Sequence, residues 1–336
     1  MPTEKTFPSR TTGRRRVLAM LAALTALPTA YAQPGAAYPA KPVRLIVGFP
    51  AGTGPDILAR LLAQKLSALW GNAAVVIDNK PGAGGVIAAS EAARAPADGY
   101  TLLLGLTGNM VIAPASYSRL TYDPLKDFVP VSQVVSNEFV LLTNPAKVPA
   151  KNLREFVAWS TKQPQGIFMG TFGAGTPGHF AAYIFGDAAG IRTEVVHYKN
   201  TGDALAGLVG GDVHGMFGSV GVAAPQVKAG KLAALASTGP ARNSALPEVP
   251  TMKEQGYNLE ITSWFGIVAP ARTPKEIVDK LSADIQAAVK SPDTLAKIEA
   301  AGFTGTGTSR EEFARIIAAD AAVWGKAVKA TGFKAD

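Results

Sequence analysis

The fold is decided by the stretch Val43-Arg44-Leu45-Ile46-Val47-Gly48-Phe49-Pro50-Ala51-Gly52-Thr53-Gly54. Its first five residues have the composition of a buried strand. The loop that follows is rich in glycine and proline, and leucines then recur at 58, 62, 66 and 69, on one face of a helix. The pattern predicts a strand, a tight loop and a helix that begins near Pro55 or Asp56.

The same order of strand, loop and helix recurs along the chain. Further strands are expected at residues 74–77, 101–104, 139–143, 167–169, 193–196, 213–217 and 261–268. Helices are expected around 88–93, 153–161, 178–187, 204–209, 221–229, 274–289 and 311–330. This alternation predicts an α/β fold in which helices cover both faces of a mostly parallel sheet. Two α/β lobes fit the order better than one large sheet.

The first 32 residues have the three parts of an export signal. Arg14, Arg15 and Arg16 precede an apolar run at 17–27, and Ala30-Tyr31-Ala32 provides a small-x-small cleavage pattern. The run is too short for a membrane-spanning helix, which needs about 20 residues. We therefore expect a signal peptide that is cleaved near Ala32 and a periplasmic mature protein. The paired arginines leave both general secretion and twin-arginine export open.

Removal of this segment halves the net charge of the chain. The 336 residues carry 33 Lys and Arg against 25 Asp and Glu, or +8. Residues 1–32 contain five of the bases and one acid, which leaves 28 against 24, or +4, after cleavage. The remaining bases are dispersed, so no nucleic-acid partner is expected. No later stretch reaches 18 apolar residues, which favours a soluble mature protein.

The composition also excludes several kinds of site. Hydrophobic residues make up 47% of the chain and charged residues 17%, unlike a disordered protein. There is no cysteine, which excludes disulfides, thiolate metal sites, a cysteine nucleophile and a cysteine-linked lipid anchor. Neither a P-loop nor a complete dinucleotide fingerprint occurs. No cofactor and no metal are therefore expected.

Glycine-rich loops are the strongest local signal for a binding site. They lie at 51–54, 81–85, 107–109 and 171–178, at the expected carboxyl ends of strands, where open α/β sheets bind ligands. Backbone N–H groups in such loops can bind a carboxylate or a phosphate without an arginine. The alternative is that these glycines only form tight turns.

Catalytic patterns are weak in comparison. The histidines His179, His197 and His214 lack the spacing of a metal motif. Ser219 misses the G-x-S-x-G pattern because Phe217 occupies the first glycine position. Asp56, like two other single carboxylates at 203 and 212, fits a capping role. An exported α/β hydrolase or lyase that acts on a small carboxylate through Ser219 or His179 remains the alternative to a binding protein, since a triad can assemble in space.

Several longer segments together resemble one family. The segments, in chain order, are Tyr38-Pro39-Ala40-Lys41-Pro42-Val43-Arg44-Leu45-Ile46-Val47-Gly48-Phe49-Pro50-Ala51-Gly52, Asp78-Asn79-Lys80-Pro81-Gly82-Ala83-Gly84-Gly85, Asp98-Gly99-Tyr100-Thr101-Leu102-Leu103, Gly173-Ala174-Gly175-Thr176-Pro177-Gly178-His179, Tyr198-Lys199, Leu208-Val209-Gly210-Gly211, Pro247-Glu248-Val249-Pro250-Thr251 and Trp264-Phe265-Gly266. They are similar to the Bug family, the extracytoplasmic solute receptors of tripartite tricarboxylate transporters. The match covers essentially the whole mature chain.

The resemblance implies a periplasmic-binding-protein-like, or Venus flytrap, fold, in which two α/β domains surround a ligand cleft. Domain 1 would combine 33–131 with 258–336, and domain 2 would be 132–257. A monomer would capture a small carboxylate by loop amides and deliver it to a membrane permease or present it to a sensor protein, with no catalytic residues of its own.

The same resemblance implies a set of ligand-binding residues. Those of domain 1 would be Phe49, Ala51, Gly52, Thr53, Asp56, Gly82, Ala83, Gly84, Thr107 and Asn109, and those of domain 2 would be Thr171, Gly175, Thr176, His179, Tyr198 and Ser219. Thr53 departs from the family, which usually has a second glycine there before its Asp. This change adds a hydroxyl or reshapes the first loop.

Overall fold

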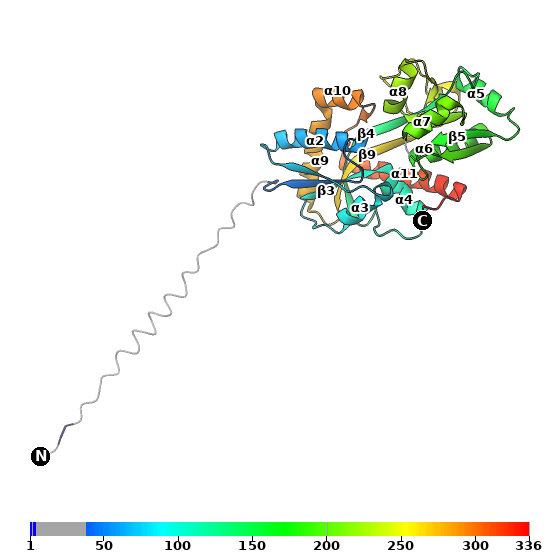
Figure 1. The fold of residues 1–336 in the computed structure, drawn as a ribbon. Helices are drawn as coiled ribbons and strands as arrows, with labels where there is room; N and C mark the ends of the chain where they lie inside the picture. Colours follow the sequence, from blue (N-terminus) through cyan, green and yellow to red (C-terminus); the bar gives the residue numbers. More distant parts are fainter. Residues whose placement is uncertain (2, 5–37, 200, 336) are drawn as a thin grey trace. The chain divides into compact units, whose positions relative to one another are not determined.

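The computed structural model describes residues 1, 3, 4, 38–199 and 201–335 (Figure 1). Internal contacts divide the chain into Met1–Tyr38 and Pro39–Asp336, and the second unit contains every helix and strand described below. The arginines, apolar run and cleavage site of the expected export signal, residues 14–32, lie outside the described residues. Within those residues, no helix is both long and apolar enough to cross a bilayer.

The first strand set contains the expected strand at 43–47, with a further strand on each side of it. Its strands are β1 (Val43–Val47), β2 (Val75–Asn79), β3 (Thr101–Leu106), β9 (Thr262–Pro270) and β10 (Thr304–Gly305). Strand β1 lies between β2 and β3 and is parallel to both, whereas β9 is antiparallel to β3. The connections β1–β2 and β2–β3 run in opposite directions across the sheet. Because such crossovers are right-handed, the helices α2 (Gly54–Leu69) and α3 (Val86–Ala93) cover opposite faces.

The second strand set repeats this arrangement. Its strands are β5 (Ile167–Thr171), β6 (Thr193–His197), β7 (Gly215–Ser219) and β8 (Ala233–Ser237). Strand β5 lies between β7 and β6 and is parallel to both. The crossover helices α6 (Pro177–Ala189) and α7 (Thr201–Gly210) therefore also lie on opposite faces, and their buried residues belong to two different hydrophobic clusters.

Strand β4 (Phe128–Thr143) joins the two strand sets. It pairs with β9 along Phe128–Glu138 and with β7 along Phe139–Leu142, and β8 also pairs with its last residues. The buried Glu138 stands at this change of partner, where its carboxylate accepts hydrogen bonds from the Asn243 amide at 2.6 Å and the Thr304 hydroxyl at 2.9 Å. The two sets are therefore one continuous network of pairing that changes partners along a single strand.

The remaining helices pack around the two strand sets. They are the π-helix η2 (Gly108–Ile112), the 3₁₀ helices η1 (Ala83–Gly85) and η3 (Lys253–Gln255), and the α-helices α4 (Ala113–Ser116), α5 (Leu153–Ser160), α8 (Val220–Lys228), α9 (Lys275–Lys290), α10 (Pro292–Ala300) and α11 (Arg310–Thr331). Side-chain caps begin α5 and α11, since Asn152 accepts the N–H of Glu155 and Ser309 accepts the N–H of Glu312. Helix α11 packs against β4 and α6, and so contacts elements of both sets.

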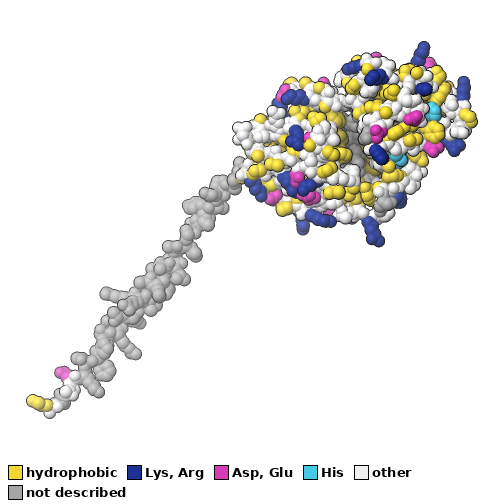
Figure 2. All heavy atoms as spheres, in the orientation of Figure 1, with side chains coloured by type: hydrophobic (Ala, Val, Ile, Leu, Met, Phe, Trp, Pro, Cys, Tyr) yellow, Lys and Arg dark blue, Asp and Glu magenta, His cyan; other side chains and the backbone are white. Residues whose placement is uncertain are grey.

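The structure confirms the α/β class and most expected elements, and it corrects the expected strand directions. The sheet is mixed rather than mostly parallel, because β9 is antiparallel to β3 and β4 is antiparallel to every strand it pairs with. The expected strand at 139–143 is only the end of β4, and β8, β10 and α10 were not predicted. On the face drawn in Figure 2, Lys and Arg side chains are scattered rather than gathered into one patch.

Candidate functional site

The expected binding residues lie at the carboxyl ends of the parallel strands of both sets. We call residues 49–54, after β1, the first loop; residues 80–85, after β2, the second loop; and residues 171–176, from the end of β5, the third loop. Thr107 follows β3, Tyr198 follows β6 and Ser219 ends β7. These residues therefore lie at the carboxyl ends of six strands, which are parallel within each set. Open α/β proteins bind ligands at such ends.

Asp56 holds the first loop in place. Its carboxylate is 2% exposed and accepts the N–H of Gly52 at 2.8 Å, the Nε–H of Arg60 at 2.9 Å and the amide of Asn79 at 3.0 Å. Hydrogen bonding to Arg60, Gly52 and Asn79 outweighs burial and lowers the pKa of Asp56 to about 2. All of these contacts are internal, so the side chain braces the loop.

The first and second loops are tied to each other. The Asn79 amide at the end of β2 also donates to the carbonyl of Phe49 at 2.9 Å. Thr53, the departure from the family pattern, donates its hydroxyl to the Pro50 carbonyl at 2.7 Å and makes no side-chain cap for α2. Its hydroxyl therefore closes the turn of the first loop, whose Ala51 and Gly52 are exposed.

The second loop has an unusual backbone. Four consecutive residues have positive φ: Gly82 at 138°, Ala83 at 47°, Gly84 at 61° and Gly85 at 93°. Successive N–H groups in such a conformation form a concave site for an anion. The N–H groups of Ala83 and Gly84 open the first turn of η1, where a helix offers no acceptor, and no backbone acceptor outside the helix pairs with them among the described residues. This loop can therefore bind a carboxylate through its backbone.

A close backbone approach holds the second loop against β1. A Cβ built on Gly48 would lie 2.7 Å from the Cα of Gly85. The ring of Phe49 also lies beside Gly85, at 3.5 Å from the position of a Cβ there. Gly48 is required because a side chain there would meet the backbone of Gly85. Gly85 is required because its φ is positive.

Thr107 and Asn109 have internal partners. Thr107 is 1% exposed, and its hydroxyl accepts the N–H of Trp264 at 2.8 Å, which links β3 to β9. Asn109 is fully buried, accepts the N–H of Leu106 at 2.8 Å and donates to the carbonyl of Gly85 at 3.3 Å. Both side chains thus hold the walls of the site, and Asn109 fixes the end of the second loop.

The third loop is closed by its own hydroxyl groups. Thr176 donates to the carbonyl of Gly173 at 2.8 Å, and its oxygen lies 3.2 Å from the buried Thr171 hydroxyl. Thr176 also accepts the N–H of His179, which caps α6. The positive end of the helix dipole of α6 therefore points toward this loop.

His179 supports the third loop from behind. Its Nδ1 accepts the N–H of Gly175 at 3.2 Å, so this nitrogen carries no proton. Burial, together with His197, whose ring centroid is 4.6 Å away, lowers the pKa of His179 to about 4. In the described part of the chain no carboxylate hydrogen-bonds to His179 or Ser219, and no three His, Asp or Glu residues are grouped as metal ligands.

Tyr198 and Ser219 belong to the second strand set, and the N–H of Tyr198 donates to the carbonyl of Thr171, the first residue of the third loop, at 2.9 Å. The Tyr198 ring packs over Gly170 and Gly207, against α7. Ser219 precedes α8 and makes no side-chain cap. The next residues of α8 meet the turn at 301–302, where a Cβ on Gly221 would lie 2.8 Å from the carbonyl of Ala301. Phe303 of the same turn lies beside Gly54, so this turn contacts both strand sets.

One cleft brings the second and third loops together. It has a volume of about 400 Å³, and among the residues expected to bind ligand it is lined by Ala83, Gly84 and Gly175. The other lining residues come from the start of α3, the segment 108–117, the third loop and the C-terminus, namely Val86, Gly108, Ile112, Ala113, Ser116, Tyr117, Ala174, Phe333, Lys334 and Ala335. The C-terminal residues were not predicted, and no motif in the sequence signals them.

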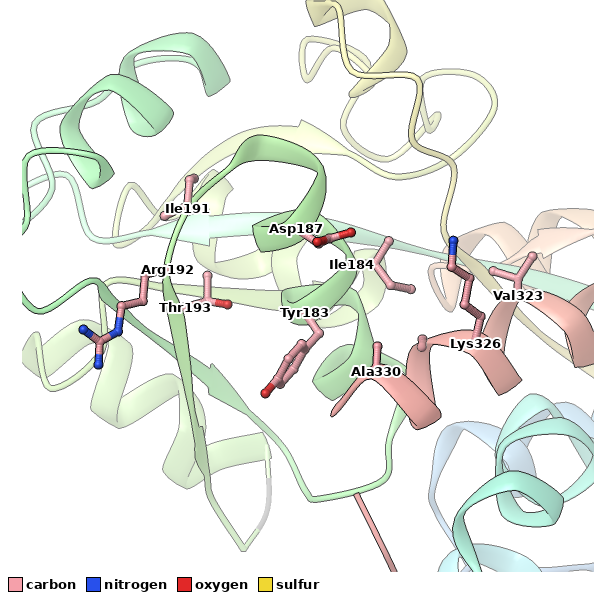
Figure 3. Close-up of a pocket in the computed structure, with 10 residues that line it drawn as sticks. Tyr183, Ile184, Asp187, Ile191, Arg192, Thr193, Val323, Lys326 and Ala330 are labelled. Atoms are coloured by element: carbon pink, nitrogen blue, oxygen red, sulfur yellow. The ribbon is translucent and has the colours of Figure 1, made fainter. Parts of the chain in front are cut away.

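A second cavity lies elsewhere. It has a volume of about 620 Å³ and lies between α6 and α11, with side chains from both helices turned toward it (Figure 3). Most of its lining is apolar, for example Ile184, Ile191 and Val323, and none of the expected binding residues line it. The smaller cleft is therefore the candidate site.

Known proteins are similar to this chain in both sequence and fold. A profile described as the tripartite tricarboxylate transporter family receptor matches residues 50–333. The protein BugT of Bordetella pertussis is 33% identical over 88% of this chain and 91% of its own length. Rpa4515 of R. palustris, solved with adipate, is 32% identical, with a TM-score of 0.77 over 88% of this chain and 99% of that one.

A third relative is also a solved structure with a ligand. MatC of Rhodopseudomonas palustris, with bound malate, is 28% identical, with a TM-score of 0.72 over 87% of this chain and all of that one. These matches span nearly the whole described unit. Together with the profile match they establish that this chain is a solute-binding receptor and belongs to the tripartite tricarboxylate transporter receptor family.

Proposed function

We propose that this receptor captures a small carboxylated solute in the cleft between the second and third loops and delivers it to a membrane transporter. The observation that carries the proposal is the backbone of the second loop, where Ala83 and Gly84 have positive φ and N–H groups without a backbone acceptor among the described residues. The third loop, at the N-terminus of α6, lies on the same cleft. Solved relatives that contain adipate and malate support a carboxylate as the ligand.

The two strand sets would act as two domains. The expected domains are 33–131 plus 258–336 and 132–257, and we place the first crossing later, between Glu138 and Phe139, where β4 changes its partners. A ligand that contacts loops of both sets stabilises the closed arrangement in proportion to its extra affinity for that state. Closure is then the signal that a transporter recognises.

The site of action follows from the export signal. We propose that residues 1–32 are removed near Ala32 and that the mature chain acts as a monomer in the periplasm. Its partner would be a membrane permease, or a sensor protein that reads the closed receptor. A protein that works through backbone amides needs no catalytic residue, metal or cofactor.

Thermal unfolding of the ligand-stripped protein tests this function. We expect a member of a panel of amino acids, dicarboxylates and aromatic acids to raise the melting temperature by several degrees, since saturation at 100 times Kd adds about 2.7 kcal/mol. The exposed Ala174 lines the cleft. The variant Ala174→Trp should fill the cleft and abolish the shift.

A matched control keeps this result specific. Ala188 is exposed on α6 and lines neither cavity described above, so Ala188→Trp should retain the full shift. The proposal fails if no carboxylate in the panel changes the melting temperature of the wild-type protein. It also fails if both tryptophan variants respond to ligand as the wild type does.

A further inference from the structure

The C-terminal tail, residues Phe333–Ala335, forms one wall of the candidate cleft. Helix α11 ends at Thr331, and Gly332, with a φ of 65°, turns the chain away from the helix axis. The Thr331 hydroxyl then accepts the N–H of Phe333 at 3.2 Å. The turn thus places the last residues across the cleft rather than along α11.

Phe333 packs directly on the third loop. A Cβ built on Gly175 would lie 3.1 Å from the Phe333 ring. The same ring meets His179 edge to face, with a centroid distance of 5.2 Å and an angle of 80°. It also meets Phe180 at 5.9 Å. Because His179 accepts the N–H of Gly175, Phe333 packs on both partners of the hydrogen bond that shapes this loop.

The end of the tail is attached to the first strand set. The N–H of Ala335 donates to the carbonyl of Ser116, at the end of α4, at 2.9 Å. Ser116 lines the cleft on the side of the second loop. Three consecutive residues therefore connect the third loop to the opposite wall of the cleft.

Lys334 gives this cleft its charge. It is the one charged side chain among the described residues that line the cleft, where glycine, alanine and other uncharged residues predominate. It is exposed, and it forms no ion pair with an acidic residue within the described part of the chain. A carboxylate bound to the N–H groups of the second loop would have this ammonium group on the same cleft.

We propose that the C-terminal tail is part of the ligand site, with Phe333 as a positioning residue for the third loop and Lys334 as the ion-pair partner for a second carboxylate of a solute whose first carboxylate is bound by the second loop. The inference rests on the proposed function, because it assigns the solute to this cleft. It adds residues that no motif of the sequence indicates. It also implies that tail and loops together select the ligand.

Calorimetric titration of the mature protein tests each role separately. The probes are two dicarboxylates, adipate and malate, each matched with a monocarboxylate of the same chain length, hexanoate and 2-hydroxybutyrate. We expect Lys334→Gln to weaken dicarboxylate binding about fivefold, the upper range for an exposed ion pair, and to leave the monocarboxylate almost unchanged. The control Lys326→Gln removes a lysine of α11 that lines the other cavity, and it should bind as the wild type does.

The Phe333 variants separate positioning from general stability. We expect Phe333→Ala to weaken both members of a probe pair by a similar factor, about tenfold, because the third loop contacts either acid. Phe333→Tyr keeps the ring and should restore binding. All titrations are made well below the melting temperature of each variant, so that lost stability alone does not change the measured Kd.

The outcomes distinguish the two proposals. If the wild type binds a probe and both Lys334→Gln and Phe333→Ala bind it with unchanged Kd, the tail proposal is wrong and the proposed function stands. If the wild type binds no carboxylate, the proposed function is wrong and the tail proposal fails with it. A loss of dicarboxylate preference in Lys334→Gln alone, with rescue in Phe333→Tyr, supports the tail proposal.

Discussion

Asp56 shows how a residue near a ligand loop can act without touching the ligand. Its carboxylate has three hydrogen-bond donors, from Gly52, Arg60 and Asn79. Two of them belong to the first loop and its helix, and the third comes from β2. A substitution here should therefore change stability and loop geometry together.

The variant Asp56→Asn tests this role. We expect it to lower the free energy of unfolding by about 1 to 3 kcal/mol at pH 7, the usual cost of a lost charged hydrogen bond. The pKa of Asp56 is held at about 2, below its ordinary 3.8. Its contribution is therefore complete above pH 3.8 and is lost as the pH falls from 3.8 through 2.

Urea unfolding at pH 7 and at pH 2 measures this difference. The free energies of unfolding of the wild type and Asp56→Asn should differ most at pH 7 and become nearly equal near pH 2. As a control, Glu311→Gln alters a carboxylate that is 72% exposed, and it should change stability by less than about 1 kcal/mol. A difference between Asp56→Asn and the wild type that does not depend on pH would contradict the account.

His179 predicts a second pH dependence, at milder acidity. Its folded pKa is about 4, below the ordinary 6.5, so its neutral form is favoured in the folded state. Its contribution is complete above pH 6.5 and is lost as the pH falls toward 4, by at most about 3 kcal/mol. His179→Asn keeps an acceptor for Gly175 but does not titrate in this range, so stability should fall less steeply between pH 6.5 and 4.

A second histidine provides the matched control. His214 also accepts a backbone N–H through Nδ1, from Phe168 at 2.9 Å, and burial also lowers its pKa. It lies beside Trp159 and Phe168, and it does not line the cleft. His214→Asn should therefore flatten the acid response as well and leave carboxylate binding unchanged. If stability falls as steeply between pH 6.5 and 4 in His179→Asn as in the wild type, a lowered pKa of His179 is not the cause of that fall.

At the level of elements, the sequence predicted which segments form strands and helices, and in which order, better than it predicted the direction of the strands. The expected strand at 43–47 and the helix after its loop are confirmed, because alternating runs of apolar residues and glycine are local signals. The antiparallel course of β4 and β9 depends on contacts between residues more than 120 positions apart. Strand β8, with the sequence Ala233-Ala234-Leu235-Ala236-Ser237, has little β-propensity and forms because it pairs with β4.

Site prediction shows the same limit. The glycine-rich loops were visible in the sequence because a close approach or a positive φ requires glycine. Whether Asn109 and Thr107 face the cleft or the interior depends on partners in distant elements, Gly85 and Trp264, which the local sequence does not indicate. The contribution of Phe333 to the cleft has no local signal either, since it arises from the packing of the tail on α6.

The contact between β1 and the second loop gives an element-scale prediction. In Gly48→Ala the new Cβ would lie 2.7 Å from the Cα of Gly85, where backbone has to move. We expect a loss of about 1 to 3 kcal/mol in stability and a smaller ligand-induced rise in melting temperature. Gly325→Ala, in α11, has no atom within 4 Å of the new Cβ and should be neutral or stabilising by up to about 1 kcal/mol.

Differential scanning calorimetry measures both quantities, with and without a carboxylate that raises the melting temperature of the wild type. The pair of glycine variants separates the cost of a methyl group at a close approach from the general effect of alanine. Equal stability of Gly48→Ala and Gly325→Ala would contradict the packing of β1 against the second loop.

For the molecule as a whole, β4 and the C-terminal tail are the structures that contact both strand sets most directly. β4 changes partner at Glu138, and the tail joins Gly175 to Ser116. A receptor built this way should close when a carboxylate contacts both sides of its cleft. Small-angle scattering is expected to show a smaller radius of gyration with a saturating carboxylate than without it. An identical radius in both states, with binding confirmed by calorimetry, would contradict closure.

Native mass spectrometry of protein purified without unfolding tests the central claim most directly. The wild type and Ala174→Trp are prepared in parallel and then incubated with the same carboxylate panel. We predict that the wild type carries a small molecule whose accurate mass and fragmentation identify a carboxylic acid, and that Ala174→Trp has the mass of the protein alone. Unmodified protein mass for the wild type in every sample, or a bound molecule without a carboxyl group, would contradict the account.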